Sequence, residues 1–283
     1  MKPALLVPTD FSEPAWVALN YAAQLAQKFD WHIQILHVYQ TFSRLLVNAD
    51  FQEEVSRHNT QSAQQQMAEF ENRFQQSYPE LGYSAACMEG DLSGIILDLV
   101  RENDIKFIVM GTKGASGLKH VTIGSNTFEL IQQSPIGVLA VPANYSGFKF
   151  QKIGLLSNFK ENEIDILSGF IQRSSPAIDV ALLHVRDLAN TPKTEDLIYW
   201  QDHVAKAVGI NNISYHDFEM VNRLDINEPI PYAVERLLEE EQVDVLLVPY
   251  VRKSFFSRLF SKSLPKTIAH NLMVPTYFKK LES

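Results

Sequence analysis

The sequence predicts an α/β protein in which a parallel sheet covered by helices on both faces occurs twice. Three observations lead to this expectation. The chain has 283 residues, more than one domain usually contains. Short apolar segments of strand length alternate with segments of helical periodicity, as in proteins built on parallel sheets. The order of these segments in the first half recurs in the second, which indicates a tandem duplication.

The composition is that of an ordinary globular protein, with 46% hydrophobic and 20% charged residues. The net charge of -8 argues against nucleic acid or an anionic membrane as a partner recognised through bulk charge. Cys87 is the single cysteine, which excludes an intrachain disulfide and fits a reducing compartment. The N-terminal apolar run is too short for the core of a signal peptide. No apolar run approaches the roughly 18 residues of a membrane helix, so we expect a cytoplasmic protein without stable membrane insertion.

The first half shows the alternation of strands and helices most clearly. Its predicted strands cover residues 4–10, 32–39, 83–90, 105–111 and 136–143. Its predicted helices cover residues 12–29, 52–76, 93–103 and 125–134. Ser12 is placed to cap the first helix, and Pro14 fits its first turn. The apolar segment "IKFIVM" is typical of a strand buried on both faces of a parallel sheet.

Four apolar segments of the second half repeat segments of the first. The segments "KIGLLSNF", "ALLHVRD", "QVDVLLVPY" and "NLMVPTYF" follow the order of "ALLVPTDF", "QILHVYQ", "DIKFIVMGT" and "SPIGVLAV". His37 and His184 fall at equivalent strand positions, which suggests a structural role. We expect domains at residues 1–145 and 149–283, joined at the turn-rich stretch "PANYSGF".

A glycine-rich segment, "GTKGASGLKHVTIGSNT" (residues 111–127), links a predicted strand to a predicted helix. Glycines let backbone N–H groups surround phosphate oxygens without obstruction by Cβ atoms. The helix N-terminus behind the segment would add positive dipole character. A plain connection is the alternative, because a glycine-rich turn alone is a weak signal for a ligand.

The glycine spacing is more specific than the composition. Gly111, Gly114, Gly124 and Ser125 reproduce G-x2-G-x9-G-[ST], so the segment resembles the ATP-binding signature of the universal stress protein superfamily. The likeness extends to "TDFSE", "LHV" and "SPIGVLAVP" and covers the chain as two copies. It implies a five-stranded doubly wound sheet in each copy, with strand order 3-2-1-4-5. It also implies a ligand at the carboxyl edge of strands 1 and 4.

The resemblance implies an ATP site in the first half. Asp10 would contact ribose or adenine, with Pro8 and Thr9 shaping that edge, and Val38 would pack on adenine. Met110 and Gly111 would line the base and sugar, and donors to the phosphates would come from Gly114, Gly124, Ser125 and Asn126. Mg²⁺ would be held through the phosphates, because no carboxylate cluster offers a dedicated metal site. Asp10 could also cap the first helix, and Ser125 to Thr127 could cap the helix that they begin.

The second half departs from this pattern. Asn158 stands at the position of Asp10, Pro249 at that of Gly111, Arg252 at that of Gly114 and Lys262 at that of Gly124. Proline has no N–H to donate, so we expect no ATP in the second half. In the glycine-free segment 250–267, basic residues interleave with apolar ones, namely Arg252, Lys253, Arg258 and Lys262 with Phe255, Phe256, Leu259 and Phe260. It either binds an acidic protein partner or lipid headgroup, or simply packs over an empty cleft.

Together these features predict a nucleotide-responsive stress or regulatory protein that binds ATP in its first half only. The alternative is a non-nucleotide scaffold or regulator, whose basic and aromatic segment binds a protein or lipid. No residue is placed as a general base, so no catalytic residue is expected, and ATP hydrolysis would at most be slow. Because related proteins pair through their last strands, "IGVLAVPA" and "MVPTYF" are expected to pair within one chain as a pseudo-dimer. A further homodimer and an unknown protein partner are left open.

Overall fold

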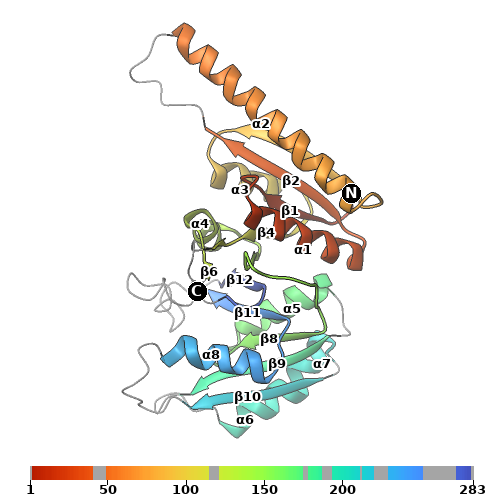
Figure 1. Cartoon of the computed structure of the whole chain (residues 1–283). Helices are drawn as coiled ribbons and strands as arrows, with labels where there is room; N and C mark the ends of the chain where they lie inside the picture. Colours follow the sequence, from red (N-terminus) through yellow and green to blue (C-terminus); the bar gives the residue numbers. More distant parts are fainter. Residues whose placement is uncertain are drawn as a thin grey trace.

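The structure of the chain is a computed structural model, and it describes residues 2–40, 49–114, 121–174, 178–186, 193–210, 212–219, 229–250 and 272–281. In these residues the strands form one ten-stranded sheet and a separate two-stranded sheet. Helices cover both faces of the large sheet (Figure 1). The expected α/β fold with mostly parallel strands is confirmed.

The first half supplies five adjacent strands of the large sheet. They are β1 (Ala4–Pro8), β2 (His32–Tyr39), β3 (Tyr83–Glu89), β4 (Ile105–Gly111) and β7 (Val138–Val141). The helices between them are α1 (Glu13–Phe29), α2 (Ala49–Ser77), α3 (Leu92–Glu102) and α4 (Ser125–Gln133). All pairings are parallel in the order β3-β2-β1-β4-β7. Counted within the half, this is the expected order 3-2-1-4-5.

The second half repeats this arrangement. Its strands are β8 (Lys152–Leu156), β9 (Asp179–Arg186), β10 (Ile213–Glu219), β11 (Val245–Tyr250) and β12 (Thr276–Lys280). Its helices are α5 (Glu163–Ser174), α6 (Thr194–Tyr199), the π-helical turn η1 (Trp200–Val204), α7 (Ala205–Val208) and α8 (Pro229–Glu240). The strands run parallel in the order β10-β9-β8-β11-β12. The register repeats as well, since Leu5 pairs with Phe107 and its counterpart Ile153 pairs with Val245.

Each face of the sheet has its own core, because alternate strand residues point to opposite sides. Leu5 and Val7 belong to the core that lies under α1, α2, α5 and α7, whereas Leu6 belongs to the core under α3, α4 and α8. Helix α2 is polar overall but has one buried stripe, consisting of Ala63, Met67, Phe70 and Phe74. This stripe at helical spacing explains why a segment so rich in glutamine folds onto the sheet.

The two halves join where β7 and β12 pair antiparallel, with Leu139 opposite Tyr277. This is the expected pairing of the last strands, and it places β12 between the two halves (Figure 1). The Tyr277 ring is 1% exposed and lies 5.2 Å from the Phe107 ring and 4.9 Å from the Phe170 ring, measured between centroids. A Cβ atom at Gly137 would lie 1.8 Å from Cε2 of Tyr277. The junction therefore depends on a large side chain from one half filling a space that glycine leaves in the other.

Two short strands inside the glycine-rich segment were not predicted. Strands β5 (Lys113–Gly114) and β6 (Val121–Thr122) pair antiparallel and form the two-stranded sheet. The periodicity of the sequence gives no sign of strands this short, because two residues carry no alternation.

Replacing Gly137 with alanine should destabilise the whole chain by about 1–3 kcal/mol, because the added methyl group overpacks the Tyr277 ring. Urea unfolding followed by tryptophan fluorescence measures the loss. Gly169→Ala, inside α5, is the matched control. Its new Cβ atom would have only Nζ of Lys279 nearby, at 3.8 Å. Equal stability of Gly137→Ala and wild type would contradict this account of the junction.

Candidate functional site

A cleft lies at the carboxyl ends of β1, β2 and β4, beside the N-termini of α1 and α4. Its lining consists of Pro8, Thr9, Asp10, Ser12, Pro14, Ala15, His37, Val38, Leu92, Met110, Gly111, Thr112, Gly124, Ser125, Asn126 and Thr127. Nine of the ten residues predicted from the sequence are in this set. The tenth, Gly114, lies in β5, and its surroundings lie outside the described residues. The fold thus brings together residues more than a hundred positions apart in the chain.

Seven lining residues were not predicted as site residues. Ser12, Pro14, Ala15 and Thr127 are contributed by the starts of α1 and α4, and Thr112 directly follows β4. These five residues could have been predicted from the sequence, because they are close neighbours of Asp10, Gly111 and Asn126 in the chain. Leu92 begins α3, and nothing in the local sequence distinguishes it from a core leucine.

The turn after β1 is held by short-range hydrogen bonds. The Phe11 amide donates to Oγ1 of Thr9 at 2.9 Å, and Phe11 has a φ of 63°, which is uncommon for a bulky residue. The Thr9 carbonyl accepts from Nδ1 of His37 at 2.8 Å, which ties the turn to β2. His37 therefore has the structural role expected from its position.

Asp10 acts on the start of α1 through Ser12. Ser12 is the N-cap of α1, and its hydroxyl accepts from the Ala15 amide at 3.4 Å. Oδ1 of Asp10 accepts from the Ser12 amide at 3.1 Å and from the Ser12 hydroxyl. Asp10 therefore holds the N-cap residue Ser12 in place and is not itself the N-cap of α1. Among the described residues, its Oδ2 accepts no hydrogen bond, which leaves a carboxylate oxygen at the cleft.

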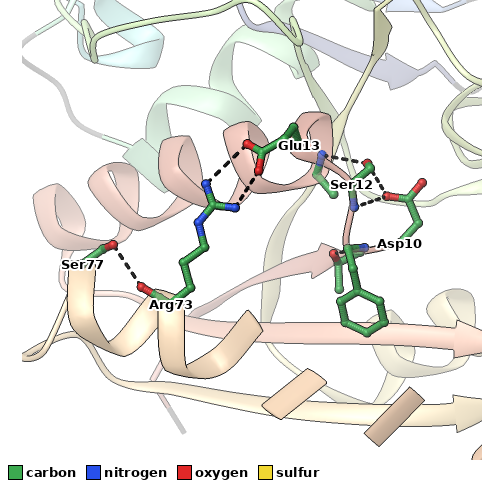
Figure 2. A network of polar contacts seen from close by, with 8 residues as sticks. Asp10, Ser12, Glu13, Arg73 and Ser77 are labelled. Atoms are coloured by element: carbon green, nitrogen blue, oxygen red, sulfur yellow. Dashed lines mark hydrogen bonds and ion pairs between the residues drawn. The ribbon is translucent and has the colours of Figure 1, made fainter. Parts of the chain in front are cut away.

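Arg73 of α2 fixes the same end of α1 from the other side (Figure 2). Its Nη1 donates to Oε1 of Glu13 at 2.7 Å, and its Nη2 donates to Oε2 at 3.4 Å. The guanidinium also lies 3.9 Å from the centre of the Trp16 ring. The hydrogen bond from Arg73 lowers the pKa of the Glu13 carboxyl. The pair is exposed and adds about 0–1 kcal/mol, so its main effect is to orient α1.

Gly111 has a structural role in addition to the one predicted. A Cβ atom at this position would lie 2.3 Å from the carbonyl oxygen of Pro14 and 3.0 Å from the Ala15 nitrogen. The end of β4 and the first turn of α1 can approach this closely only without a side chain. The next residue, Thr112, is fully buried, and both its amide and its hydroxyl donate to the Val141 carbonyl.

Helix α4 begins at the cleft with a cap that supplies no acceptor. Its N-cap is Gly124, in extended backbone and without a side-chain hydrogen bond. Ser125, Asn126 and Thr127 form the first turn of the helix and do not act as the cap. A helix N-terminus carries backbone N–H groups without intrahelical partners and a partial positive charge. The arrangement is therefore suited to an anionic group in the cleft.

The second half preserves the turn but not its surroundings. The Phe159 amide donates to Oγ of Ser157 at 2.9 Å, Phe159 has a φ of 60°, and Nδ1 of His184 donates to the Ser157 carbonyl at 2.8 Å. Asn158 takes the place of Asp10 in this turn, and Pro249 is buried in β11. The other counterparts, Arg252, Lys262 and the rest of the basic and apolar segment, lie outside the described residues.

No three His, Cys, Asp or Glu side chains among the described residues are arranged to hold a metal ion. None of the described helices combines the length and the apolar character needed to cross a membrane. Cys87 is partly buried, and burial raises the pKa of its thiol, which lowers its reactivity.

Comparisons with known proteins bear on the family. The model of the universal stress protein family matches residues 2–142. None of the curated proteins compared with the chain matches it. A universal stress protein from Archaeoglobus fulgidus has a similar structure, with a TM-score of 0.71, 20% identity and 98% of each chain covered. A putative universal stress protein from Pseudomonas aeruginosa has a TM-score of 0.57 and 13% identity, covering 99% of this chain and 94% of its own.

At these identities the two structures establish a shared fold and nothing finer. They extend the likeness over almost the whole chain, beyond the residues that the family model matches. Because the family model matches residues 2–142, the chain belongs to the universal stress protein family.

Proposed function

We propose that the first half binds ATP in the cleft between β1 and β4 and that the chain acts as a nucleotide-responsive stress protein. The observation that carries this proposal is the pairing of two complementary features across one cleft. The Asp10 carboxylate lies at one side, and the uncapped N-terminus of α4 lies at the other. A nucleotide has hydroxyl donors at its sugar and anionic oxygens at its phosphates, which match these two features.

The phosphates would bind at the start of α4. The backbone N–H groups of Ser125, Asn126 and Thr127 have no side-chain cap to compete for them. The helix dipole favours an anion at this place by about 0.3–1 kcal/mol or more. Mg²⁺ would be held through the phosphates, because the described residues offer no carboxylate cluster near the cleft.

The nucleoside would lie against the ends of β1, β2 and β4. Val38 and Met110 provide apolar surface for a base, and Pro8 and Thr9 bound the same edge. Asp10 would accept from a ribose hydroxyl or an adenine amino group through the oxygen that Ser12 does not use. No residue of the cleft is positioned as a general base by the contacts described above, so we propose binding rather than turnover.

For the second half we propose no ATP site, on the ground that Asn158 and Pro249 replace Asp10 and Gly111. The domains would be residues 1–145 and 149–283. The alternative function, a scaffold whose basic and aromatic segment binds a protein or lipid, depends on residues outside those described. A cytoplasmic location remains part of the proposal.

Replacing Gly124 with aspartate should weaken ATP binding while leaving the fold intact. Gly124 has extended backbone that any residue can adopt, and aspartate is a favourable N-cap. The new carboxylate would take the α4 amides and repel phosphates, so affinity should fall at least about 10-fold. Equilibrium dialysis with radiolabelled ATP and MgCl₂ measures the affinity of each variant. Gly124→Asn, a neutral cap of the same shape, should lose less, and equal affinities for the two variants would refute the charge argument.

Asp10→Asn, which installs the residue of the second half, should weaken ATP binding about 10-fold or more. A hydrogen bond to a charged group contributes about 1.5–3 kcal/mol, and an amide accepts more weakly than a carboxylate. Calorimetric titration of the full chain with MgATP provides the measurement, and Glu80→Gln, at an exposed acid in the loop before β3, serves as the control. Unchanged affinity in Asp10→Asn would remove Asp10 from the site.

A further inference from the structure

Glu163, the first residue of α5, directs a buried carboxylate into the turn at the end of β8. The residue is 2% exposed. Its Oε2 accepts from the Ser157 hydroxyl at 2.7 Å, and both carboxylate oxygens lie 3.1 Å from the Asn158 amide nitrogen. The Lys160 amide donates to Oε2 at 3.4 Å. One side chain thus accepts hydrogen bonds from three donors of the turn.

The same turn in the first half has no such acceptor. Thr9 and Ser157 are equivalent, since each accepts from the amide of a phenylalanine two residues on and from a histidine of the neighbouring strand. Counting forward from this pair places Ala15 at the position of Glu163. Ala15 is among the residues that line the cleft. Within the part of the chain that the structure describes, the Asp10 amide finds no hydrogen-bond acceptor.

The helices also begin differently. Helix α1 starts at Glu13, whereas α5 starts at Glu163, which is two residues later when counted from the equivalent phenylalanines Phe11 and Phe159. In the first half the close contact of Pro14 with the end of β4 permits only glycine at position 111. The later start of α5 agrees with a proline, Pro249, at the corresponding end of β11. The second half therefore differs from the first both at the start of the helix and at the end of the neighbouring strand.

We propose that Glu163 determines the ligand specificity of the second half, because its carboxylate already accepts the hydrogen bonds at the end of β8 and so excludes ligands that carry their own anionic acceptor. A phosphate or carboxylate of a ligand would have to compete for the Ser157 hydroxyl and the Asn158 amide, beside a buried negative charge. Burial raises the pKa of the Glu163 carboxyl, whereas its hydrogen bonds with Ser157, Asn158 and Lys160 oppose the shift. The proposal does not depend on which ligand the first half binds.

Replacing the Glu163 carboxylate with a small carboxylate from solution tests this proposal directly. Glu163→Ala restores the residue of the first half and leaves unpaired donors around an empty space. The variant of the full chain should melt below wild type in sodium chloride, because buried donors without partners are costly. Sodium formate at equal ionic strength should restore at least half of the lost melting temperature by occupying the space of the missing carboxylate. Formate should leave wild type unchanged relative to chloride.

Two further variants make the result specific. Glu161→Ala removes an exposed acid two residues away and should respond to formate as wild type does. Glu163→Gln fills the space with a neutral side chain and should also show no formate effect. If Glu163→Ala does not fold in chloride, the refolding yield in formate against chloride replaces the melting temperature as the readout. A formate effect on Glu163→Ala no larger than that on wild type, by either readout, would overturn the proposal.

Discussion

The organisation of both halves depends on the hydrogen bond between a strand histidine and the carbonyl that ends the first strand. Nδ1 of His37 reaches the Thr9 carbonyl, and Nδ1 of His184 reaches the Ser157 carbonyl, both at 2.8 Å. This bond fixes a tight turn with a phenylalanine at positive φ, and the turn sets where the following helix can begin. In a doubly wound sheet that place is the ligand edge, so a bond between two strands determines the geometry of the cleft.

The two halves show how one turn can serve two purposes. In the first half the helix starts early, a small Ala15 side chain follows, and Gly111 allows the strand and helix to meet. The result is a cleft with an available carboxylate and an uncapped helix. In the second half Glu163 satisfies the turn from inside the chain. The antiparallel pairing of β7 with β12 then locks the two halves into one sheet, so the second half can stabilise the first whether or not it binds a ligand.

The alternation of strands and helices could be predicted from the sequence, because it depends on local patterns that recur in each half. The Ser12 cap follows from such a pattern, whereas the strand order, the cleft lining and the pairing of the last strands were expected from the family resemblance. The contact between Gly111 and Pro14 could not be predicted, since it joins residues almost a hundred positions apart. Glu163 was not recognised for a similar reason. An acidic residue at the start of a helix is usually exposed to solvent and interacts with the helix dipole. Only the fold shows that the Glu163 side chain is buried.

We propose that the carboxyl edge of the sheet in the first half is open to a nucleotide, whereas Glu163 of the chain itself occupies the corresponding edge in the second half. A crystal structure of the full chain grown with ATP and MgCl₂ tests it most directly. We predict one nucleotide per chain, with its phosphates at the N-terminus of α4, its ribose or base at Asp10, and Glu163 still bonded to Ser157 and Asn158. Nucleotide density in the second half, with the Glu163 side chain displaced, would contradict the account.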